Sequence, residues 1–371
     1  MICRKEDCMK KTKVLHVSYG GLGKGGVSSV IFSITEHLTE QFDFGCVVFS
    51  TKGISEERFE KIGKLHRVNC YIPGSLIEKL VRPFRMYSEI KKICKNEQYD
   101  VIHCHNGEEE AFALLAAKHA GIKIRIAHSH NTKSLRKISF VKKIYCRILQ
   151  NSIKKNATQK VACSAKAAID FFETTEDVVV IPNSIDLDRY YENRNAEESH
   201  LRFVHVGRYD YSKNQEFILD VFRIIHQKNP ESTLRLVGFG ADEQFLKKKA
   251  TDLNLNDSVS FIPGDTDVPA EYKKADYMIF PSRYEGFGIV LIEAQAAGVY
   301  CFVSESIQPE ANAGFLKQLS LNDSAEIWAN TILLYHAEHP RKEENRKEYY
   351  NNYKADIVSD KYGELYERSK E

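Results

Sequence analysis

The chain of 371 residues lacks any apolar run of about 18 residues or more, so no transmembrane helix is expected. Its first residues, 1–7, have no apolar core, and a signal peptide is not expected either. The nine cysteines are scattered without a Cys-x-x-Cys pair, which argues against a zinc ribbon or a disulfide framework. These absences favour a cytoplasmic protein with reduced thiols.

Acidic residues are absent from 111 to 169, a stretch that contains thirteen Lys and Arg. Residues 1–190 carry 31 Lys and Arg against 21 Asp and Glu, although the net charge of the chain is only +2. Within this half, 79–95 and 133–155 combine helical apolar spacing with interleaved basic residues. Two interpretations of these segments stay open. They are helices that bind peripherally to the anionic inner face of a membrane, or core helices whose basic side is exposed to solvent. No nucleic-acid partner is expected.

Short apolar segments alternate with amphipathic ones along the whole chain, which predicts an α/β fold with parallel sheets. The length predicts two domains, with the change between them near 183–191, so that the domains are 1–185 and 186–354. The expected strands are 14–17, 46–49, 101–104, 124–127, 161–163 and 178–181, followed by 203–206, 234–237, 259–262, 277–280 and 301–303.

The segment from Pro281 to Ala294 predicts a strand end, a glycine-rich turn and a helix. Glu285 falls in the turn and Glu293 in the apolar helix, about 80° apart around the axis if both are helical. A carboxylate in an apolar helix needs a partner, and a pair of sugar or ribose hydroxyls is one. The alternative is a helix N-terminal Glu with a second, solvated Glu.

A second strand–turn–helix segment contains Gly207-Arg208 and, after four residues, Lys213-Asn214. Two cations near a helix N-terminus at the carboxyl end of a strand form an anion site suited to a diphosphate. A solvated lysine is the alternative for this pattern taken alone.

Together the two motifs resemble the donor site of retaining glycosyltransferases of family 4. That family has the GT-B fold, in which two Rossmann-like domains face each other across a deep cleft. Segments 181–186 and 275–282 also match its pattern, and 127–132 is similar to its branch that builds capsular and exopolysaccharides. The resemblance further implies that a C-terminal helix, about 355–371, packs back on the first domain.

The resemblance implies transfer of a hexose-type sugar from a nucleotide diphosphate sugar, with a UDP-sugar favoured, to a hydroxyl of a saccharide acceptor, with retention. A lipid-linked acceptor, such as an undecaprenyl-linked saccharide, would bind the first domain and the nucleotide sugar the second. Arg208 and Lys213 would stabilise the leaving diphosphate, while Glu293 holds the ribose. Glu285 and His130 would orient the sugar. The implied donor-binding residues are Gly25, Gly26, Gly207, Arg208, Lys213, Glu285, Gly286, Phe287, Gly288, Ile289 and Glu293.

No cofactor and no metal site are expected. The histidine pairs 103/105 and 128/130 lack carboxylate or cysteine companions at ligand spacing, and a structural role is the alternative for His103 and His105. In the segment Asp265-x-Asp267, Asp267 is predicted at or near the N-cap of a short helix, which is favoured over a metal ligand. Arg208 and Lys213 can also neutralise the diphosphate without a metal.

Other classes of enzyme are weighed against this one. The loop 20–26 satisfies G-x-G-x-x-G, but the acidic residue that would bind the ribose, expected after the next strand, is missing. Its absence disfavours an NAD-dependent oxidoreductase. Gly25 and Gly26 are instead assigned to contact with the donor or acceptor, and a tight turn without a ligand is the alternative. A nucleotide-sugar 2-epimerase of the same fold is the main rival. The sequence also departs from the family near 300–310, where a proline and a glycine pair are absent, so the donor sugar is left open.

Overall fold

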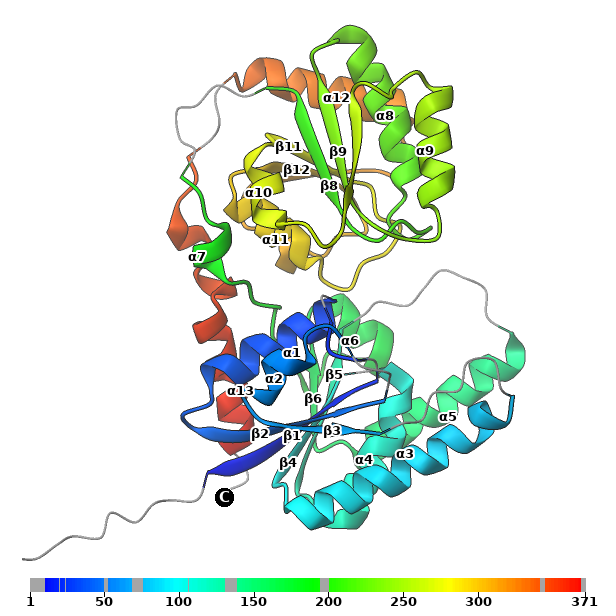
Figure 1. Ribbon diagram of the computed structural model, residues 1–371, viewed down its shortest axis with the longest axis vertical. Helices are drawn as coiled ribbons and strands as arrows, with labels where there is room; N and C mark the ends of the chain where they lie inside the picture. Colours follow the sequence, from blue (N-terminus) through cyan, green and yellow to red (C-terminus); the bar gives the residue numbers. More distant parts are fainter. Residues whose placement is uncertain are drawn as a thin grey trace, which may run out of the picture. The chain divides into compact units, whose positions relative to one another are not determined.

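The computed structural model describes residues 11–19, 21–23, 25–49, 53–68, 76–105, 107–130, 139–193, 200–340 and 344–367, without the side chains of 76–80. Contacts divide these residues into two compact units, and the division falls between Ile181 and Pro182. The last helix, α13 (Ala355–Glu367), belongs to the first unit, and Pro182–Lys354 belongs to the second. Figure 1 shows both units, and each is considered by itself below.

The first unit is built on a parallel sheet with the strand order β3-β2-β1-β4-β5-β6-β7. Because the order reverses direction between β1 and β4, the carboxyl ends of these two strands form the point where α/β sheets usually bind ligands. The strands are β1 (Thr12–Ser18), β2 (Phe42–Val48), β3 (Lys64–Arg67), β4 (Val101–Cys104), β5 (Ile124–Ser129), β6 (Gln159–Ala162) and β7 (Val178–Val180).

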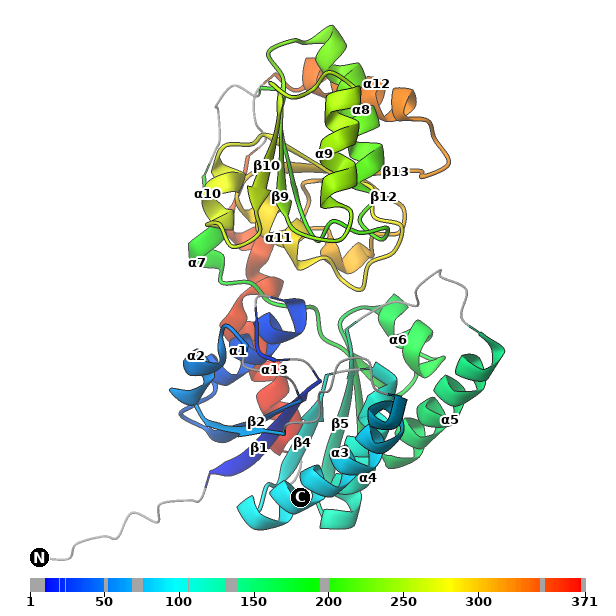
Figure 2. The same ribbon diagram turned by 45° about the vertical axis from the view of Figure 1, so that its right-hand side comes forward.

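Helices cover both faces of this sheet, as Figures 1 and 2 show. Side chains such as Leu15, Val17 and Cys104 enter a core under α3, α4 and α5, whereas the alternate residue His16 points to the face that α13 covers. The helices are α1 (Gly26–His37), α2 (Glu56–Glu60), α3 (Leu76–Glu97), α4 (Glu110–Ala120), α5 (Phe140–Asn156) and α6 (Ala165–Phe172), with the 3-10 turn η1 (Gly107–Glu109).

The second unit repeats the plan with the parallel order β10-β9-β8-β11-β12-β13, which places its reversal between β8 and β11. One face packs on α8, α9 and α12, and the other on α10 and α11. Its elements are α7 (Leu187–Tyr190), β8 (Arg202–Val206), α8 (Gln215–Lys228), β9 (Thr233–Gly238), α9 (Glu243–Asp252), β10 (Val259–Pro263), α10 (Val268–Lys273), β11 (Tyr277–Phe280), α11 (Ile289–Ala296), β12 (Tyr300–Ser304), η2 (Pro309–Ala311), β13 (Leu316–Leu319), α12 (Ala325–Glu338) and η3 (Lys347–Tyr353).

The predicted α/β architecture with two parallel sheets is therefore confirmed. Two edge strands, β3 and β13, were not predicted, because Lys64–Arg67 and Leu316–Leu319 mix apolar and polar residues and none of their side chains is fully buried. Among the described helices, none has the length and hydropathy that crossing a bilayer requires.

Candidate functional site

The turn after β8 carries the two predicted cations and is shaped by its neighbours. Asn214 adopts the left-handed conformation, with φ of 59°, as the N-cap of α8, and its Nδ2 donates to the Pro281 carbonyl at 3.2 Å. A Cβ on Gly207 would lie 3.2 Å from Nε2 of His205 and 3.5 Å from Cγ of Lys213. A glycine at 207 therefore leaves room for the lysine stem.

Arg208 and Lys213 lie in different surroundings. The side chain of Arg208 is 72% exposed, and its guanidinium is 3.4 Å from the carboxylate of Asp210. The side chain of Lys213 is only 15% exposed, and it forms an ion pair with Glu285, which is 17% exposed. Its Nζ also lies 5.1 Å from the centroid of the Phe280 ring. The structure thus brings together one cation from the β8 turn and one carboxylate from the β11 turn.

The β11 turn places Glu285 outside the helix. The helix α11 begins at Ile289, so Glu285 lies in the turn, as the sequence predicts, and Glu293 lies on the helix. The turn ends at Gly288, whose φ of +86° is a backbone conformation that residues other than glycine rarely adopt. The neighbouring Phe287 is buried, with its ring 6.3 Å from that of Tyr353, and Gly286 is buried beside it.

Glu293 lies on α11, partly buried among tyrosines. The Tyr272 hydroxyl donates to its Oε2 at 3.3 Å, and Tyr190 also hydrogen-bonds the carboxyl. Burial raises the pKa of Glu293 to about 7, while these two hydrogen bonds oppose the rise. Near neutral pH the Glu293 carboxyl therefore populates both its ionised form, which only accepts hydrogen bonds, and its protonated form.

Hydrogen bonds and a cation–π contact fix the β8 and β11 turns to each other. Arg283 donates from its backbone N–H to the Ser212 carbonyl at 2.8 Å, and its guanidinium bonds the Tyr211 carbonyl and stacks on that ring at 4.2 Å. At the end of β12, the hydroxyls of Ser304 and Ser306 both donate to the Ser282 carbonyl, at 2.5 and 2.6 Å. These two hydroxyls hold the β11 turn from the side of β12.

Gly25, Gly26 and His130, the remaining predicted site residues, belong to the first unit. Gly25 is the N-cap of α1 and Gly26 its first residue, and a Cβ on Gly25 would meet no atom within 4 Å. Backbone conformation does not require glycine at 25, since its φ is −83°. The open space there is compatible with a ligand that approaches the helix N-terminus, which is an anion-binding position.

His130 belongs to a cluster that the sequence reasoning missed. Five imidazoles converge where β1, β4 and β5 end: His16, His103, His105, His128 and His130. The strand β5 continues to Ser129, so His128 and His130 share a face, with ring centroids 3.8 Å apart. Neighbouring strands of the parallel sheet bring other histidines to each pair, and only the strand order reveals these neighbours.

Asp267 takes the predicted position at a helix start. It is the N-cap residue of α10, although its side chain makes no capping hydrogen bond. Its carboxylate lies 3.4 Å from the guanidinium of Arg189, with both side chains more than half exposed.

Two family models match adjoining parts of the chain, which together span residues 24–313. The model described as Glycosyltransferase Family 4 matches residues 24–189, and the model described as Glycosyl transferases group 1 matches 188–313. The second match contains both the Arg208–Lys213 and the Glu285–Glu293 motifs.

Three relatives and one solved structure are similar over most of the chain. EpsF of Bacillus subtilis is 29% identical over 86% of each chain. The UDP-Gal:alpha-D-GlcNAc-diphosphoundecaprenol alpha-1,3-galactosyltransferase of Escherichia coli is 25% identical over 79% of each, and the capsular polysaccharide biosynthesis glycosyltransferase CapH of Staphylococcus aureus is 26% identical over 86% of this chain and 89% of its own. Alr3699/HepE of Anabaena, solved in complex with UDP and glucose, superposes with a TM-score of 0.76 at 18% identity, covering 96% of this chain and all of the other. The chain belongs to glycosyltransferase family 4, and its fold is GT-B.

Proposed function

We propose that this glycosyltransferase moves a hexose-type sugar from a nucleotide diphosphate sugar, a UDP-sugar by preference, to a hydroxyl of a lipid-linked saccharide, with retention at the anomeric carbon. The pathway would be the synthesis of a capsular polysaccharide, exopolysaccharide or related surface glycan. The observation that carries the proposal is the pairing of Lys213 with Glu285 where β8 and β11 end side by side.

In the proposed mechanism, the diphosphate competes with Glu285 for Lys213. The exposed guanidinium of Arg208 adds a second cation, because little holds it in the ligand-free protein. Charge that develops on the leaving diphosphate is then stabilised by two cations, so no metal ion is needed at this step. The part of the chain that the structure describes shows no carboxylate beside these cations other than Asp210 and Glu285.

The remaining residues position the donor. Glu293 accepts hydrogen bonds from the ribose hydroxyls in its ionised form, while Glu285 and His130 orient the sugar. Gly25 and Gly26 let the backbone of α1 approach the donor or acceptor. Catalysis rests on positioning and electrostatics, with no enzymic nucleophile assigned.

The UDP preference and the lipid-linked acceptor are supported by relatives. The name of the Escherichia coli relative specifies UDP-Gal and a diphosphoundecaprenol acceptor, and the Anabaena structure contains UDP and glucose. The CapH name specifies capsular polysaccharide biosynthesis.

Helix α5 offers a surface suited to an anionic membrane, where such an acceptor would be anchored. Its first turns expose apolar side chains, with Phe140 75% and Val141 76% exposed. Lys142, Lys143 and Arg147 are exposed on the same helix. Exposed apolar residues beside cations are typical of a helix that lies in a membrane interface. In a helix that faces only water, exposed Phe and Val side chains would gain nothing from burial.

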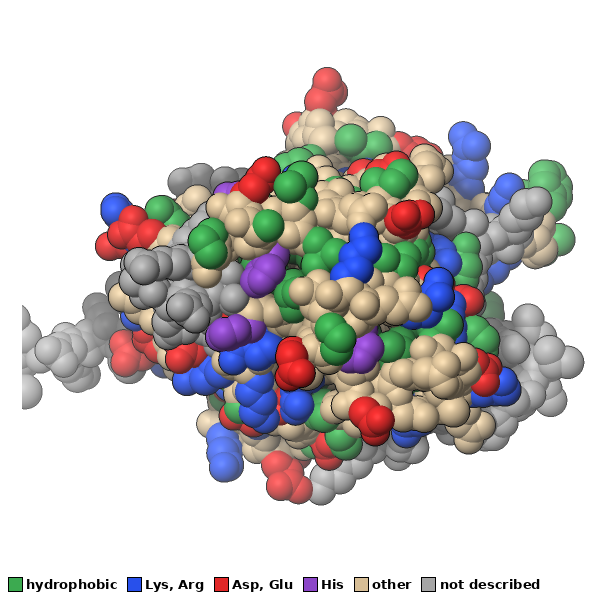
Figure 3. All heavy atoms as spheres, turned by 90° about the horizontal axis from the view of Figure 1, so that it is seen from above, with side chains coloured by type: hydrophobic (Ala, Val, Ile, Leu, Met, Phe, Trp, Pro, Cys, Tyr) green, Lys and Arg blue, Asp and Glu red, His purple; other side chains and the backbone are tan. Residues whose placement is uncertain are grey.

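A second helix contributes to this surface. Phe84 of α3 is 77% exposed, and α3 and α5 both pack against α4 in the first unit (Figures 1 and 2). By contrast, the face in Figure 3 mixes acidic and basic side chains. Arg136 and Lys137, which the sequence analysis includes in the basic segment, lie outside the described residues. We propose peripheral attachment to the inner leaflet through α5 and α3.

The proposal is tested by incubating the protein with UDP-, GDP- and ADP-sugars and measuring free nucleotide with and without a saccharide acceptor. Release of UDP that requires the acceptor is expected. Release of nucleotide without an acceptor, together with inversion of the sugar at C2, would instead identify a nucleotide-sugar 2-epimerase.

A further inference from the structure

Strand alternation brings five histidines to one face of the first sheet. His16 and His103 are direct register partners on β1 and β4, and His105 follows His103 by two residues. The intervening Cys104 points to the opposite face, into the core under α4. Four of the five rings are fully buried, and His130, at the end of β5, is partly buried.

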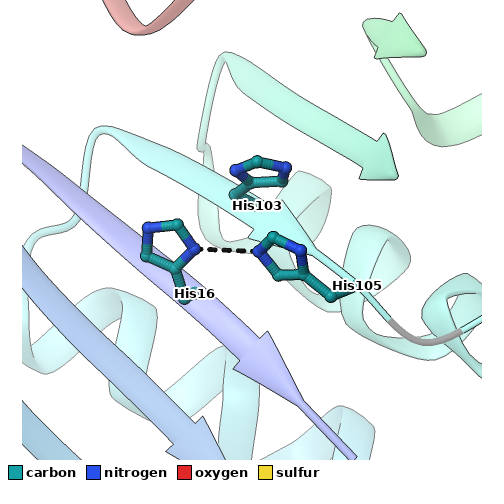
Figure 4. Close-up of side chains that lie close together, drawn as sticks. All are labelled: His16, His103 and His105. Carbon is teal, nitrogen blue, oxygen red and sulfur yellow. Dashed lines mark hydrogen bonds between the residues drawn. The ribbon is translucent and has the colours of Figure 1, made fainter. Parts of the chain in front are cut away.

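Ring nitrogens of this cluster contact one another directly. Nδ1 of His16 and Nε2 of His105 are 2.9 Å apart (the dashed line in Figure 4), and Nδ1 of His105 lies 2.9 Å from Nε2 of His130. In a second chain, Nε2 of His103 is 3.1 Å from Nδ1 of His128, and Nδ1 of His103 is 2.7 Å from the Tyr366 hydroxyl on α13.

Proton counting shows that these chains are incomplete. Each imidazole has only two nitrogens, so the chain of three rings leaves one unpaired nitrogen at each end, and the chain of two rings leaves one at its His128 end. Within this cluster, the buried atoms without a hydrogen-bond partner are accordingly His16 Nε2, His128 Nε2 and His130 Nδ1. Buried polar atoms are usually satisfied, and three orphans in one cluster require an explanation.

Imidazole is the commonest metal ligand among side chains, and each neutral ring offers one lone pair.

We propose that His105, His128 and His130 bind a transition-metal ion, Zn²⁺ or one of similar preference, at the carboxyl ends of β4 and β5. One ligand atom from each residue lies within 4.8 Å of the other two. Tetrahedral ligands at roughly 2.0–2.1 Å from zinc are separated by roughly 3.4 Å, so small ring rotations would close the site. An all-imidazole set suits Zn²⁺, Co²⁺, Ni²⁺ or Cu²⁺ and not Mg²⁺.

The contacts behind these three ligands fit the arrangement. With the metal bound, His105 Nε2–H would donate to His16 and leave Nδ1 for the metal, while His128 Nδ1–H would donate to His103 and leave its orphaned Nε2. His103 Nδ1–H would then donate to the Tyr366 hydroxyl. Metal-bound histidines are held in this way by a partner on the other ring nitrogen. His130 is the ligand nearest solvent, which provides an entry path.

A second triple, His16, His103 and His105, is also close enough to hold an ion. It is less suitable, because His103 Nε2 is already paired with His128 Nδ1 and the orphaned nitrogen of His128 would stay unsatisfied. The two triples share only His105, so variants of the others separate them.

The test is metal binding by the full chain in the absence of any substrate. Protein stripped with a chelator is titrated with Co²⁺, the absorption bands of imidazole-bound Co²⁺ are recorded, and metal content is measured after dialysis against Zn²⁺. The variants are His128→Asn and His130→Asn, with His119→Asn as the matched control. His119 lies in the same unit on α4, exposed and bonded to Tyr87 rather than to the cluster.

One ion per chain is expected for the wild type and the His119 variant, with binding weakened by at least roughly 100-fold in both cluster variants. His103→Phe, which removes a positioning residue only, should weaken binding by roughly 10–100-fold. Binding should raise the melting temperature of the wild type and leave that of His130→Asn unchanged. Circular dichroism checks folding, and if His128→Asn does not fold, His130→Asn decides.

A wild type that retains no metal after dialysis would overturn the proposal, as would equal binding by His130→Asn. Loss of binding in His16→Asn with retention in His130→Asn would place the ion in the other triple and would also overturn the assignment. Because no sugar donor is present, these outcomes do not depend on whether the proposed transfer reaction is correct.

Discussion

Replacement of Lys213 by methionine removes the cation that the structure pairs with Glu285. Methionine keeps much of the side-chain volume, so the contact with the Phe280 ring is largely preserved. The change therefore isolates the charge. It should affect two separate properties, the stability of the ligand-free protein and the rate of sugar transfer.

Stability should fall because Glu285 loses its lysine in a mostly buried place. Breaking a buried ion pair costs about 3–5 kcal/mol. The two side chains retain 15% and 17% exposure, which lets water solvate part of the remaining charge. We expect a loss of about 2–3 kcal/mol in the free energy of unfolding, measured by urea denaturation of the second unit's transition.

Transfer should fall further than stability explains. One charge-assisted contact to a developing diphosphate charge is worth roughly 2–4 kcal/mol of barrier, which is roughly a 30- to 1000-fold loss in turnover at saturating donor. The assay is release of nucleotide diphosphate under conditions where circular dichroism shows folded protein.

The double variant Lys213→Met, Glu285→Gln separates the two effects. Removing both charges should return most of the lost stability, while turnover stays low because the diphosphate still has no lysine. A Lys213→Met protein with normal stability would contradict the buried pair. Recovery of turnover in the double variant would refute the role of Lys213 in stabilising the leaving group.

Arg208→Ala should cost roughly 2–4 kcal/mol of barrier but little stability, since its exposed contact with Asp210 contributes little; normal turnover at saturating donor would refute its role. Transfer should persist in EDTA; loss rescued by Mg²⁺ or Mn²⁺ would contradict a metal-free leaving step, whereas loss rescued only by Zn²⁺ or Co²⁺ would implicate the histidines. Since the pKa of Glu293 is raised to about 7, donor KM should fall as pH rises through that value, and Glu293→Gln should bind weakly without this pH dependence. The same raised pKa predicts that the free energy of unfolding falls with rising pH, because the folded protein keeps a proton that the unfolded chain releases above its ordinary pKa of 4.5. The contribution of Glu293 to stability is complete below pH 4.5 and lost as pH rises to about 7. Urea titrations at several pH values measure it, and a free energy of unfolding that rises over this range would contradict the prediction. Co-sedimentation with anionic liposomes should exceed that with neutral ones at low salt and should drop when Lys142, Lys143 and Arg147 are changed to Gln; equal binding to both lipids would leave α5 as a solvated helix.

Local patterns were sufficient to predict most of the fold. The strand 277–280 and the strand 101–104 coincide with β11 and β4, because each is a short apolar run between polar turns. The glycine-rich pattern also placed Glu285 in the turn and Glu293 in the helix. Gly288 ends that turn in a left-handed conformation, and α11 begins at Ile289.

The histidine cluster shows what sequence order cannot provide. His16 is 87 residues before His103, and only the order β1-β4-β5 makes them neighbours. The amount of exposed apolar surface on α5 was equally inaccessible, since helical spacing is the same for a core helix and an interfacial one.

A crystal structure with a bound nucleoside diphosphate such as UDP tests the central claim most directly. The account predicts that β-phosphate oxygens lie within hydrogen-bond distance of Lys213 Nζ and the Arg208 guanidinium, and that both ribose hydroxyls reach the Glu293 carboxylate. A nucleotide bound elsewhere in the protein, with the ion pair between Lys213 and Glu285 intact and Arg208 still directed toward Asp210, would contradict it.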